Sequence, residues 1–497
     1  MKNDRVMNVA LFIFYILIVG IMLIYHEQWF DEAQAWLIAR DLSPLKIIYQ
    51  MRYEGHPFLW HYILMPFAKL GFPYITMNII SAMFLIASAI ILLKKSPFNS
   101  FMKFLVLCST PFIYYSYVSR SYCLAVFATV LLAVFYKDRE KKPILYGVLI
   151  FFLANTHAVM LGLAIMLICT EYIYEIIFNN KKYSKQSLKK HIIGAGVASL
   201  GVLIMVVIAL IGKLSNPNAL KIELNFTNIV VQMYLSIKNI MLGQTISNVL
   251  CSTLIVLGNI TLLICLFWEK DKKPIILFLG ALFFDLIICS FGYAFAWHTT
   301  QSIMLIFLFV LWIWFEKNMG NSNLKRFIYV SSVLILIANI ALSYFLVYYD
   351  IIYNYSSSKD VADFINNNIK EDAEFFCIDD AAATSIIPHL NTKTKFFCIV
   401  TGEECSFVTH NHEREEKTNE FIKERDTEKL ENAFVLTNKP TYFIYTPLYC
   451  SQEKLNCSSE EIQILKNRNV LTEVYKSPVS IILWENYEIL KVVKNEC

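Results

Sequence analysis

Residues 9–40 read VALFIFYILIVGIMLIYHEQWFDEAQAWLIAR, and this stretch decides the class of fold. Residues 9–25 are apolar and uncharged, and a run of roughly twenty apolar residues can cross a membrane as a helix. No small-residue cleavage site follows, so we predict an uncleaved first span and not a signal peptide. After five more residues comes an acid pair, Asp31 and Glu32, which is followed by helix-forming residues. The stretch predicts a membrane protein whose first loop opens with two carboxylates.

Similar apolar runs recur along most of the chain. Of its 497 residues, 57% are hydrophobic and 17% are charged, whereas a soluble domain is about half apolar and about a quarter charged. By the length rule for apolar runs, we predict about eleven spans. They cover residues 7–25, 75–93, 101–118, 121–136, 143–155, 158–178, 191–213, 245–267, 274–292, 297–315 and 327–349.

Basic residues fall in every second loop between these spans, starting with Lys2 and Arg5 before the first. The later basic clusters contain Lys94, Lys95, Lys103, Lys137, Arg139, Lys141, Lys142, Lys181, Lys182, Lys185, Lys189, Lys190, Lys270, Lys272, Lys273, Lys317, Lys325 and Arg326. The other loops are poor in lysine and arginine, as the positive-inside rule demands of non-cytoplasmic loops. The alternation predicts a cytoplasmic N-terminus and an extracytoplasmic C-terminal part in the plasma membrane.

Residues 355–497 differ in composition, because charges are frequent and apolar runs are short. Helical spacing occurs at 360–370, and strand patterns occur at 375–378, 396–400, 442–445 and 481–484. No Gly-rich phosphate loop or nucleophile elbow is found there, so we interpret it as a structural cap. The predicted fold class is an all-α polytopic membrane protein, residues 1–354, with a small extracytoplasmic α/β domain, residues 355–497.

The first outer loop, residues 26–74, carries three short helical patterns. The first runs over 30–40, the second begins at Pro44, and the third covers 58–70. Short amphipathic helices of this kind lie in the membrane interface. A turn over Gly55 and Pro57 separates the last two.

Asp31 and Glu32 allow two interpretations. In the first, Asp31 is a helix N-cap, with Gln34 completing a pair like a capping box. In the second, the acids belong to a reactive site. Two adjacent acids exceed what a cap needs, and Glu54 and His56 form a second polar cluster in the same loop.

Three further polar residues stand at predicted outer ends of spans: Arg120, His157 and His298. Taken singly, an arginine there can snorkel to the interface, and a histidine can be an ordinary interfacial residue. Taken together on one membrane face, they favour a site. Asp285 lies deep in a predicted span, where an acid is costly, but the sequence gives it no partner.

These residue types suit a sugar carried on a polyprenyl phosphate. The phosphate is a ready leaving group whose charge needs a cation, and an arginine supplies two N–H donors in a fork. The acceptor hydroxyl needs one base, and we predict Asp31 in that role with Glu32 in support. Asp31 and Glu54 also offer the oxygen ligands that Mg²⁺ or Mn²⁺ prefers, so a divalent metal is a further candidate.

The loop motif resembles the membrane-embedded GT-C glycosyltransferases. The resemblance rests on the position of Asp31-Glu32 after the first span and on the sequence His-Pro-Phe-Leu-Trp at 56–60. The branches most alike are protein O-mannosyltransferase-like and lipid A aminoarabinose transferase-like enzymes. An uncharacterised bacterial branch is similar in the sequence RYEGHP at 52–57.

Two later motifs extend this resemblance. Arg120-Ser121-Tyr122 is similar to the family's Arg-x-Tyr, which implies that Tyr122 also contacts substrate, and Asn155-Thr156-His157 is similar to its Thr-His turn. The chain departs from the bacterial branch at Tyr114, where a glutamate is frequent, and at Trp297, where an arginine is frequent. The implied substrate-binding set is Glu54, His56, Arg120, Tyr122, His157 and His298.

The function we predict is transfer of a sugar from a polyprenyl-phosphate donor to a glycan, lipid or protein of the cell envelope. A flippase for lipid-linked glycans, a glycan polymerase or ligase, and a non-enzymatic scaffold remain alternatives. No internal repeat favours the transporter, and no basic domain face favours nucleic acid. Sugar, acceptor, oligomeric state and the pairing of the C-terminal cysteines stay open.

Overall fold

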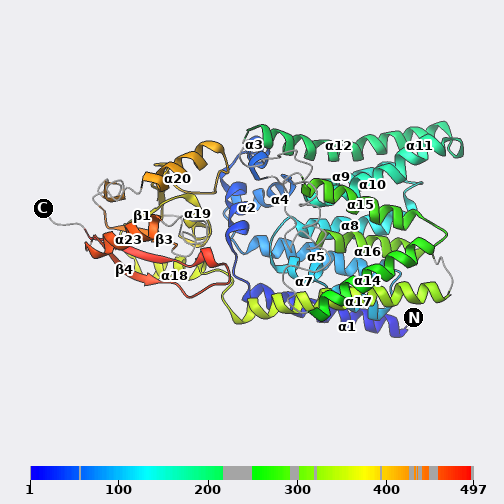
Figure 1. Ribbon diagram of the computed structural model, residues 1–497, viewed down its shortest axis with the longest axis horizontal. Coiled ribbons are helices and arrows are strands. Elements are labelled where there is room, and N and C mark those ends of the chain that lie inside the picture. Colours follow the sequence, from blue (N-terminus) through cyan, green and yellow to red (C-terminus); the bar gives the residue numbers. More distant parts are fainter. Residues whose placement is uncertain are drawn as a thin grey trace. The chain divides into compact units, whose positions relative to one another are not determined.

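The computed structural model describes residues 2–54, 57–215, 249–290, 301–317, 322–391, 394–424, 430–432, 434, 439–446, 457–468 and 470–493. The chain forms two compact units. Unit 1 contains residues 1–24, 55–60 and 78–347, and unit 2 contains residues 25–54, 61–77 and 348–497. The first outer loop thus shares a compact unit with most of the C-terminal residues. Figure 1 labels most of the helices and several strands of the two units, which are described separately below.

Unit 1 is built from helices (Figure 1). They are α1 (Lys2–Tyr25), α5 (Thr76–Lys95), α6 (Ser100–Leu107), α7 (Thr110–Tyr117), α8 (Tyr122–Phe135), η1 (Tyr136–Asp138), α9 (Pro143–Ala154), η2 (Ala158–Met160), α10 (Leu161–Ile168), η3 (Cys169–Ile173), α11 (Tyr174–Phe178), η4 (Asn180–Lys182), α12 (Lys185–Ser215), α14 (Val249–Trp268), α15 (Lys273–Ser290), α16 (Gln301–Glu316) and α17 (Ser322–Ile352).

Helices occupy each predicted span as far as the described residues reach. Five of them are long and apolar enough to cross a membrane: Asp4–Tyr25, Thr76–Lys95, Ala158–Phe178, Lys185–Ile208 and Asn323–Ile352. This confirms the prediction of a multi-pass helical membrane protein. The number of spans and their orientation stay predictions.

Small residues let neighbouring helices of unit 1 approach closely. A Cβ added to Gly147 of α9 would lie 2.2 Å from the carbonyl oxygen of Gly194 of α12. A Cβ on Gly162 of α10 would lie 2.3 Å from Asp285 Oδ1 of α15. Close backbone approach is the usual basis of helix packing in membranes, where burial of apolar surface supplies little driving force.

Unit 2 combines the loop helices with a small α/β fold. Its elements are α2 (Phe30–Asp41), α3 (Pro44–Glu54), α4 (Leu59–Lys69), α18 (Ser358–Asn368), β1 (Glu374–Cys377), α19 (Asp380–Thr384), η5 (Ile387–His389), β2 (Phe396–Cys398), α20 (His412–Glu424), β3 (Thr441–Tyr445), α23 (Cys457–Asn467), β4 (Leu471–Lys476), η6 (Leu483–Glu485) and β5 (Glu488–Val492). The three predicted loop helices, the helix at 360–370 and the first three predicted strands are confirmed.

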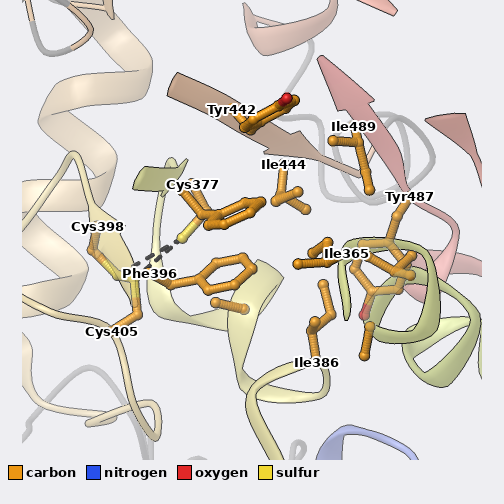
Figure 2. Packing of buried hydrophobic residues seen from close by; sticks show 14 residues of the cluster. Ile365, Cys377, Ile386, Phe396, Cys398, Cys405, Tyr442, Ile444, Tyr487 and Ile489 are labelled. Carbon is orange, nitrogen blue, oxygen red and sulfur yellow. Dashed lines mark hydrogen bonds between the residues drawn. A yellow bond between two sulfur atoms is a disulfide. The ribbon is translucent and has the colours of Figure 1, made fainter. Parts of the chain in front are cut away.

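The five strands form one sheet in the order β2-β1-β3-β5-β4. Strands β2, β1 and β3 run parallel, and β5 and β4 are antiparallel to their neighbours. Phe375 stacks on Phe396 at 5.2 Å and on Tyr442 at 5.5 Å, so one aromatic row crosses three strands. Figure 2 shows the core on this face of the sheet.

The predicted strand at 481–484 is wrong. This segment is an exposed connection between strands β4 and β5, and its end forms the short 3-10 helix η6. A short apolar run matches the strand pattern wherever it lies, and here its side chains point to the surface instead of pairing in the sheet.

Three C-terminal cysteines, whose pairing the sequence left open, meet beside this core (Figure 2). Cys398 and Cys405 form a disulfide. The free Cys377 Sγ lies 3.2 Å from Cys405 Sγ, and all three residues are buried.

Helix α2 differs from the interfacial helix that we predicted. Residues 32–39 are all buried, and the helix packs against α19 and η5 of its own unit. It therefore has no apolar face left for lipid. Helix α3 does keep such a face, because Leu45, Ile48 and Tyr49 are exposed.

Candidate functional site

Helix α2 positions the acid pair of the first loop. Trp29, in an extended conformation, precedes the helix, so Asp31 is its second residue and not its N-cap. The backbone N–H of Trp29 donates to Glu32 Oε2 at 3.3 Å, which is the reciprocal bond of a capping box. The interpretation of Asp31 as the N-cap is therefore wrong, because Trp29 holds the N-cap position and Glu32, instead of Gln34, makes the reciprocal bond. Asp31 is half-buried, whereas Glu32 is fully buried.

A buried histidine ties this helix start to the end of α17. His26 Nε2 lies 2.9 Å from Glu32 Oε2, and its Nδ1 lies 2.9 Å from Asp350 Oδ2. Burial alone would lower the pKa of His26, but the two carboxylates raise it to about 10. His26 is thus a cation at neutral pH, and it holds Glu32 in place.

A second carboxylate holds the same helix start from another side. The backbone N–H of Phe30 donates to Glu485 Oε1 at 2.6 Å, and Ser356 Oγ donates to Glu485 Oε2. Burial raises the pKa of Glu485 to about 7, because these hydrogen bonds offset the loss of hydration only in part. The N-terminus of α2 is fixed by groups far apart in sequence.

Glu54, at the end of α3, faces α2 through amide side chains. Its Oε1 accepts from Gln34 Nε2 and from Gln50 Nε2, both at 2.9 Å. Gln34 also donates to the Val408 carbonyl at 2.7 Å and accepts from the Val408 N–H at 2.8 Å. Gln34 therefore joins both loop helices to the C-terminal segment.

The acids of this loop do not gather around one point. Within the described ranges, the one group of three or more His, Cys, Asp or Glu side chains close enough to share an ion is Cys377, Cys398 and Cys405. Glu32 and Glu54 each commit one oxygen to the contacts above. The arrangement does not fit a ready-made Mg²⁺ or Mn²⁺ cage, so the predicted metal requirement stays a prediction.

In unit 1, the predicted residues Tyr122 and His157 lie together in an aromatic stack. The two rings are parallel within 23° at 4.4 Å, and Tyr115 stacks on the other face of Tyr122 at 4.6 Å. Arg120 occupies the tight turn between α7 and α8, two residues before Tyr122. The structure thus brings Tyr122 of the Arg-x-Tyr motif and the His157 turn together, whereas their membrane face stays a prediction.

Buried polar side chains of other helices fix this stack. Asn78 Nδ2 and Ser81 Oγ of α5 each donate at 2.8 Å to carbonyls in the last turn of α7, those of Tyr117 and Tyr115. The N–H of Val159 donates to His157 Nδ1 at 3.2 Å, so the proton of the neutral imidazole sits on Nε2.

Asp285, to which the sequence gave no partner, contacts the backbone of α10, the helix that follows the His157 turn. Its Oδ1 accepts from the N–H of Gly162 at 3.1 Å, in the first turn of α10. The free N–H groups at a helix start attract a carboxylate, and here the carboxylate comes from a neighbouring helix. Asp285 thereby supports the segment that carries His157.

His56 and His298 lie outside the described residues. The sequence, in turn, did not reveal His26, Asp350 or Glu485 as parts of this region. Only His26 carried a signal, because it stands directly after the first span. The two acids lie in unrelated stretches that only the folded chain brings near α2.

No family model matches the chain, and no curated protein matches it. The structure is similar to the crystal structure of ArnT from Cupriavidus metallidurans bound to undecaprenyl phosphate, with a TM-score of 0.53. The likeness covers 98% of each chain at 10% sequence identity. The two chains share one fold. The GT-C-like fold that the sequence resemblance implied is therefore confirmed over nearly the whole chain.

Proposed function

We propose that this protein transfers a sugar from a polyprenyl-phosphate donor to a glycan, lipid or protein acceptor at the outer face of the membrane. The observation that carries the proposal is the fold shared over 98% of the chain with an ArnT structure that holds undecaprenyl phosphate. The motifs of the first loop add to it, because they stand where the GT-C resemblance expects them.

Asp31 is the general base of this proposal. Of the two adjacent acids, Asp31 is the one that keeps partial exposure, whereas Glu32 is buried against His26. As the acceptor oxygen bonds to the anomeric carbon, Asp31 takes the proton of the acceptor hydroxyl. The polyprenyl phosphate departs with the electrons of its own bond to the sugar and needs no proton. Glu32 is then a positioning residue that fixes the start of α2.

Arg120 is the proposed partner of the donor phosphate. A guanidinium offers two parallel N–H donors to phosphate oxygens, which a lysine cannot do. Tyr122 follows Arg120 by two residues, and its ring stacks on that of His157. We assign this pair of rings contacts with the donor. Glu54, His56 and His298 stay in the predicted substrate-binding set. Asp31 and Glu54 stay the candidate ligands of a divalent metal.

The test is transfer from a radiolabelled polyprenyl-phosphate sugar to cell-envelope material in membranes. Asp31→Asn removes the base without changing shape, and we expect transfer to be lost while the protein still inserts. Asp41→Asn is the matched control, because Asp41 ends the same helix outside the proposed site, and its two bonds from Arg40 form a partly exposed pair that contributes little stability. Full activity of Asp31→Asn would remove the base assignment. Absence of transfer by the wild type across several donor sugars would favour the flippase.

A second variant tests the phosphate contact by itself. Arg120→Lys keeps the charge but loses the fork, so we expect a raised KM for the donor and an unchanged KM for the acceptor. An effect on the acceptor alone would contradict this role.

A further inference from the structure

Residues 478–485, called the exit loop below, show an inverted pattern of burial. Its polar side chains Ser480 and Glu485 are buried. Its apolar side chains point outward, with Val479 77% exposed and Trp484 40% exposed, and Ile481 and Leu483 are exposed too. A loop that faced water would show the opposite arrangement, since exposure of grouped apolar side chains is unfavourable there. The pattern indicates an apolar surrounding.

The exit loop is bonded to the chain just beyond a membrane span. The N–H groups of Ile481 and Ile482 donate to the carbonyls of Asn354 at 2.8 Å and Tyr355 at 3.1 Å. Both acceptors follow directly on α17, which contains the candidate span Asn323–Ile352.

These bonds set the depth of the exit loop. Asn354 follows Ile352 by two residues, so it lies at most about 7 Å beyond the end of the helix. A bilayer of about 40–45 Å with a hydrocarbon core of about 30 Å has an interfacial layer of about 5–8 Å on each side. A helix of 30 residues is about 45 Å long, which matches the whole bilayer with its headgroups. The end of α17 and the exit loop beside it therefore lie at this interfacial layer.

The end of α17 itself has the composition of an interface. Tyr348, Tyr349 and Tyr353 are exposed there, and the last two rings stack at 5.6 Å. Tyrosine and tryptophan gather at the boundary of membrane and water, because their rings are apolar and their edges carry a polar group. Trp484 extends this aromatic belt from a second segment of the chain. The exit loop carries no lysine, arginine or aspartate that would oppose insertion.

We propose that the exit loop is a membrane anchor: Val479, Leu483 and Trp484 insert among the lipids beside the end of α17. The partner is the boundary between headgroups and acyl chains, not another protein. The loop would hold the sheet-bearing part of unit 2 at the bilayer surface, because β4 and β5 begin or end directly beside it. This inference does not depend on the reaction that the protein performs.

The test is photolabelling of the full chain in lipid nanodiscs that contain a phosphatidylcholine with a diazirine near its headgroup. Trypsin separates the exit loop, in peptide 477–491, from peptide 469–476 with Val474 and from peptide 455–466 with Ile464. These two residues are the matched controls, because they are 39% and 41% exposed and belong to β4 and α23 of unit 2, outside the exit loop. We expect several-fold more label in the exit loop than in either control, at a level like that of peptide 327–359.

A variant makes the test specific. The double substitution Leu483→Glu and Trp484→Glu places two charges where insertion is costly, and we expect label to fall in 477–491 but to stay unchanged in 327–359. Equal labelling of the exit loop and the two control peptides in the wild type would overturn the proposal. Label that persists in the double variant would do the same, since the backbone alone would then account for it.

Discussion

Replacing Glu485 by glutamine should stabilise the protein at high pH and change little at low pH. The carboxyl of Glu485 is buried and accepts from Phe30 N–H at 2.6 Å and from Ser356 Oγ. Glutamine has the same shape and keeps both contacts, since its oxygen accepts from Phe30 and its amide N–H can donate to Ser356 Oγ. The substitution therefore removes the charge and little else.

The size and sign of the effect follow from the pKa of this carboxyl. Burial raises the pKa of Glu485 from 4.5 to about 7. Below pH 4.5 the group is protonated in both folded and unfolded chains and contributes nothing. Between these values the unfolded chain loses the proton first, so stability falls as pH rises. Above pH 7 the loss is complete, at about 3 kcal/mol from the pKa difference.

The assay is the melting temperature of wild type, Glu485→Gln and a control variant in nanodiscs between pH 4.5 and 8. For a unit of about 150–250 residues, a gain of about 3 kcal/mol corresponds to a rise of roughly 6–12 °C. We expect this rise at pH 8 and coincident curves at pH 4.5. Glu473→Gln is the control, because Glu473 is an exposed acid on β4. A variant that is less stable than the wild type by the same amount at every pH would refute the reasoning.

Three shorter predictions concern packing and burial. Gly162→Ala should destabilise unit 1 by about 1–3 kcal/mol, because its Cβ would lie 2.3 Å from a side-chain oxygen of Asp285. Gly196→Ala is the control and should leave stability unchanged, because nothing lies within 4 Å of its Cβ. The melting temperatures of the two variants in detergent test this. Burial and two nearby aspartates raise the pKa of the Cys377 thiol, so a maleimide at pH 7.5 should modify it only after unfolding, as mass spectrometry would show. Gln34→Ala should cost about 1–3 kcal/mol, because it strips a donor from Glu54 and leaves a buried backbone pair unbonded; urea unfolding measures this.

The membrane helices could be predicted from the sequence because the signal for each helix lies within its own residues. A run of apolar residues of sufficient length leaves few other structures open, and helices fill the predicted ranges wherever their residues are described. The break inside 101–118 was not foreseen, although Pro111 marks it: α6 ends at Leu107 and α7 begins at Thr110. A proline suits a first helical turn but not a helix interior.

The C-terminal sheet was only partly predictable. Strands β1, β2 and β3 are short aromatic runs that pair in parallel, and such buried strands have a clear apolar pattern. Strand β4 was not predicted because four of its six residues are exposed, so its sequence LTEVYK lacks a strand-like apolar pattern. The segment 481–484 was wrongly predicted to be a strand, because its apolar residues match the strand pattern although they face outward and do not pair in the sheet.

The candidate site shows most clearly what local sequence cannot give. An adjacent acid pair predicts that two carboxylates are near each other but not that they do different work. The difference arises from His26 and Asp350, which are 324 residues apart and yet share a hydrogen bond at 2.9 Å. That bond buries Glu32 in a charged network and leaves Asp31 half-exposed on the next position of the helix. A base must reach its substrate, whereas a positioning residue need not, so the difference in burial fits the roles that we propose for Asp31 and Glu32. The proposed reaction therefore needs only Asp31 as a base, while the bond to His26 gives Glu32 a structural role at the start of α2.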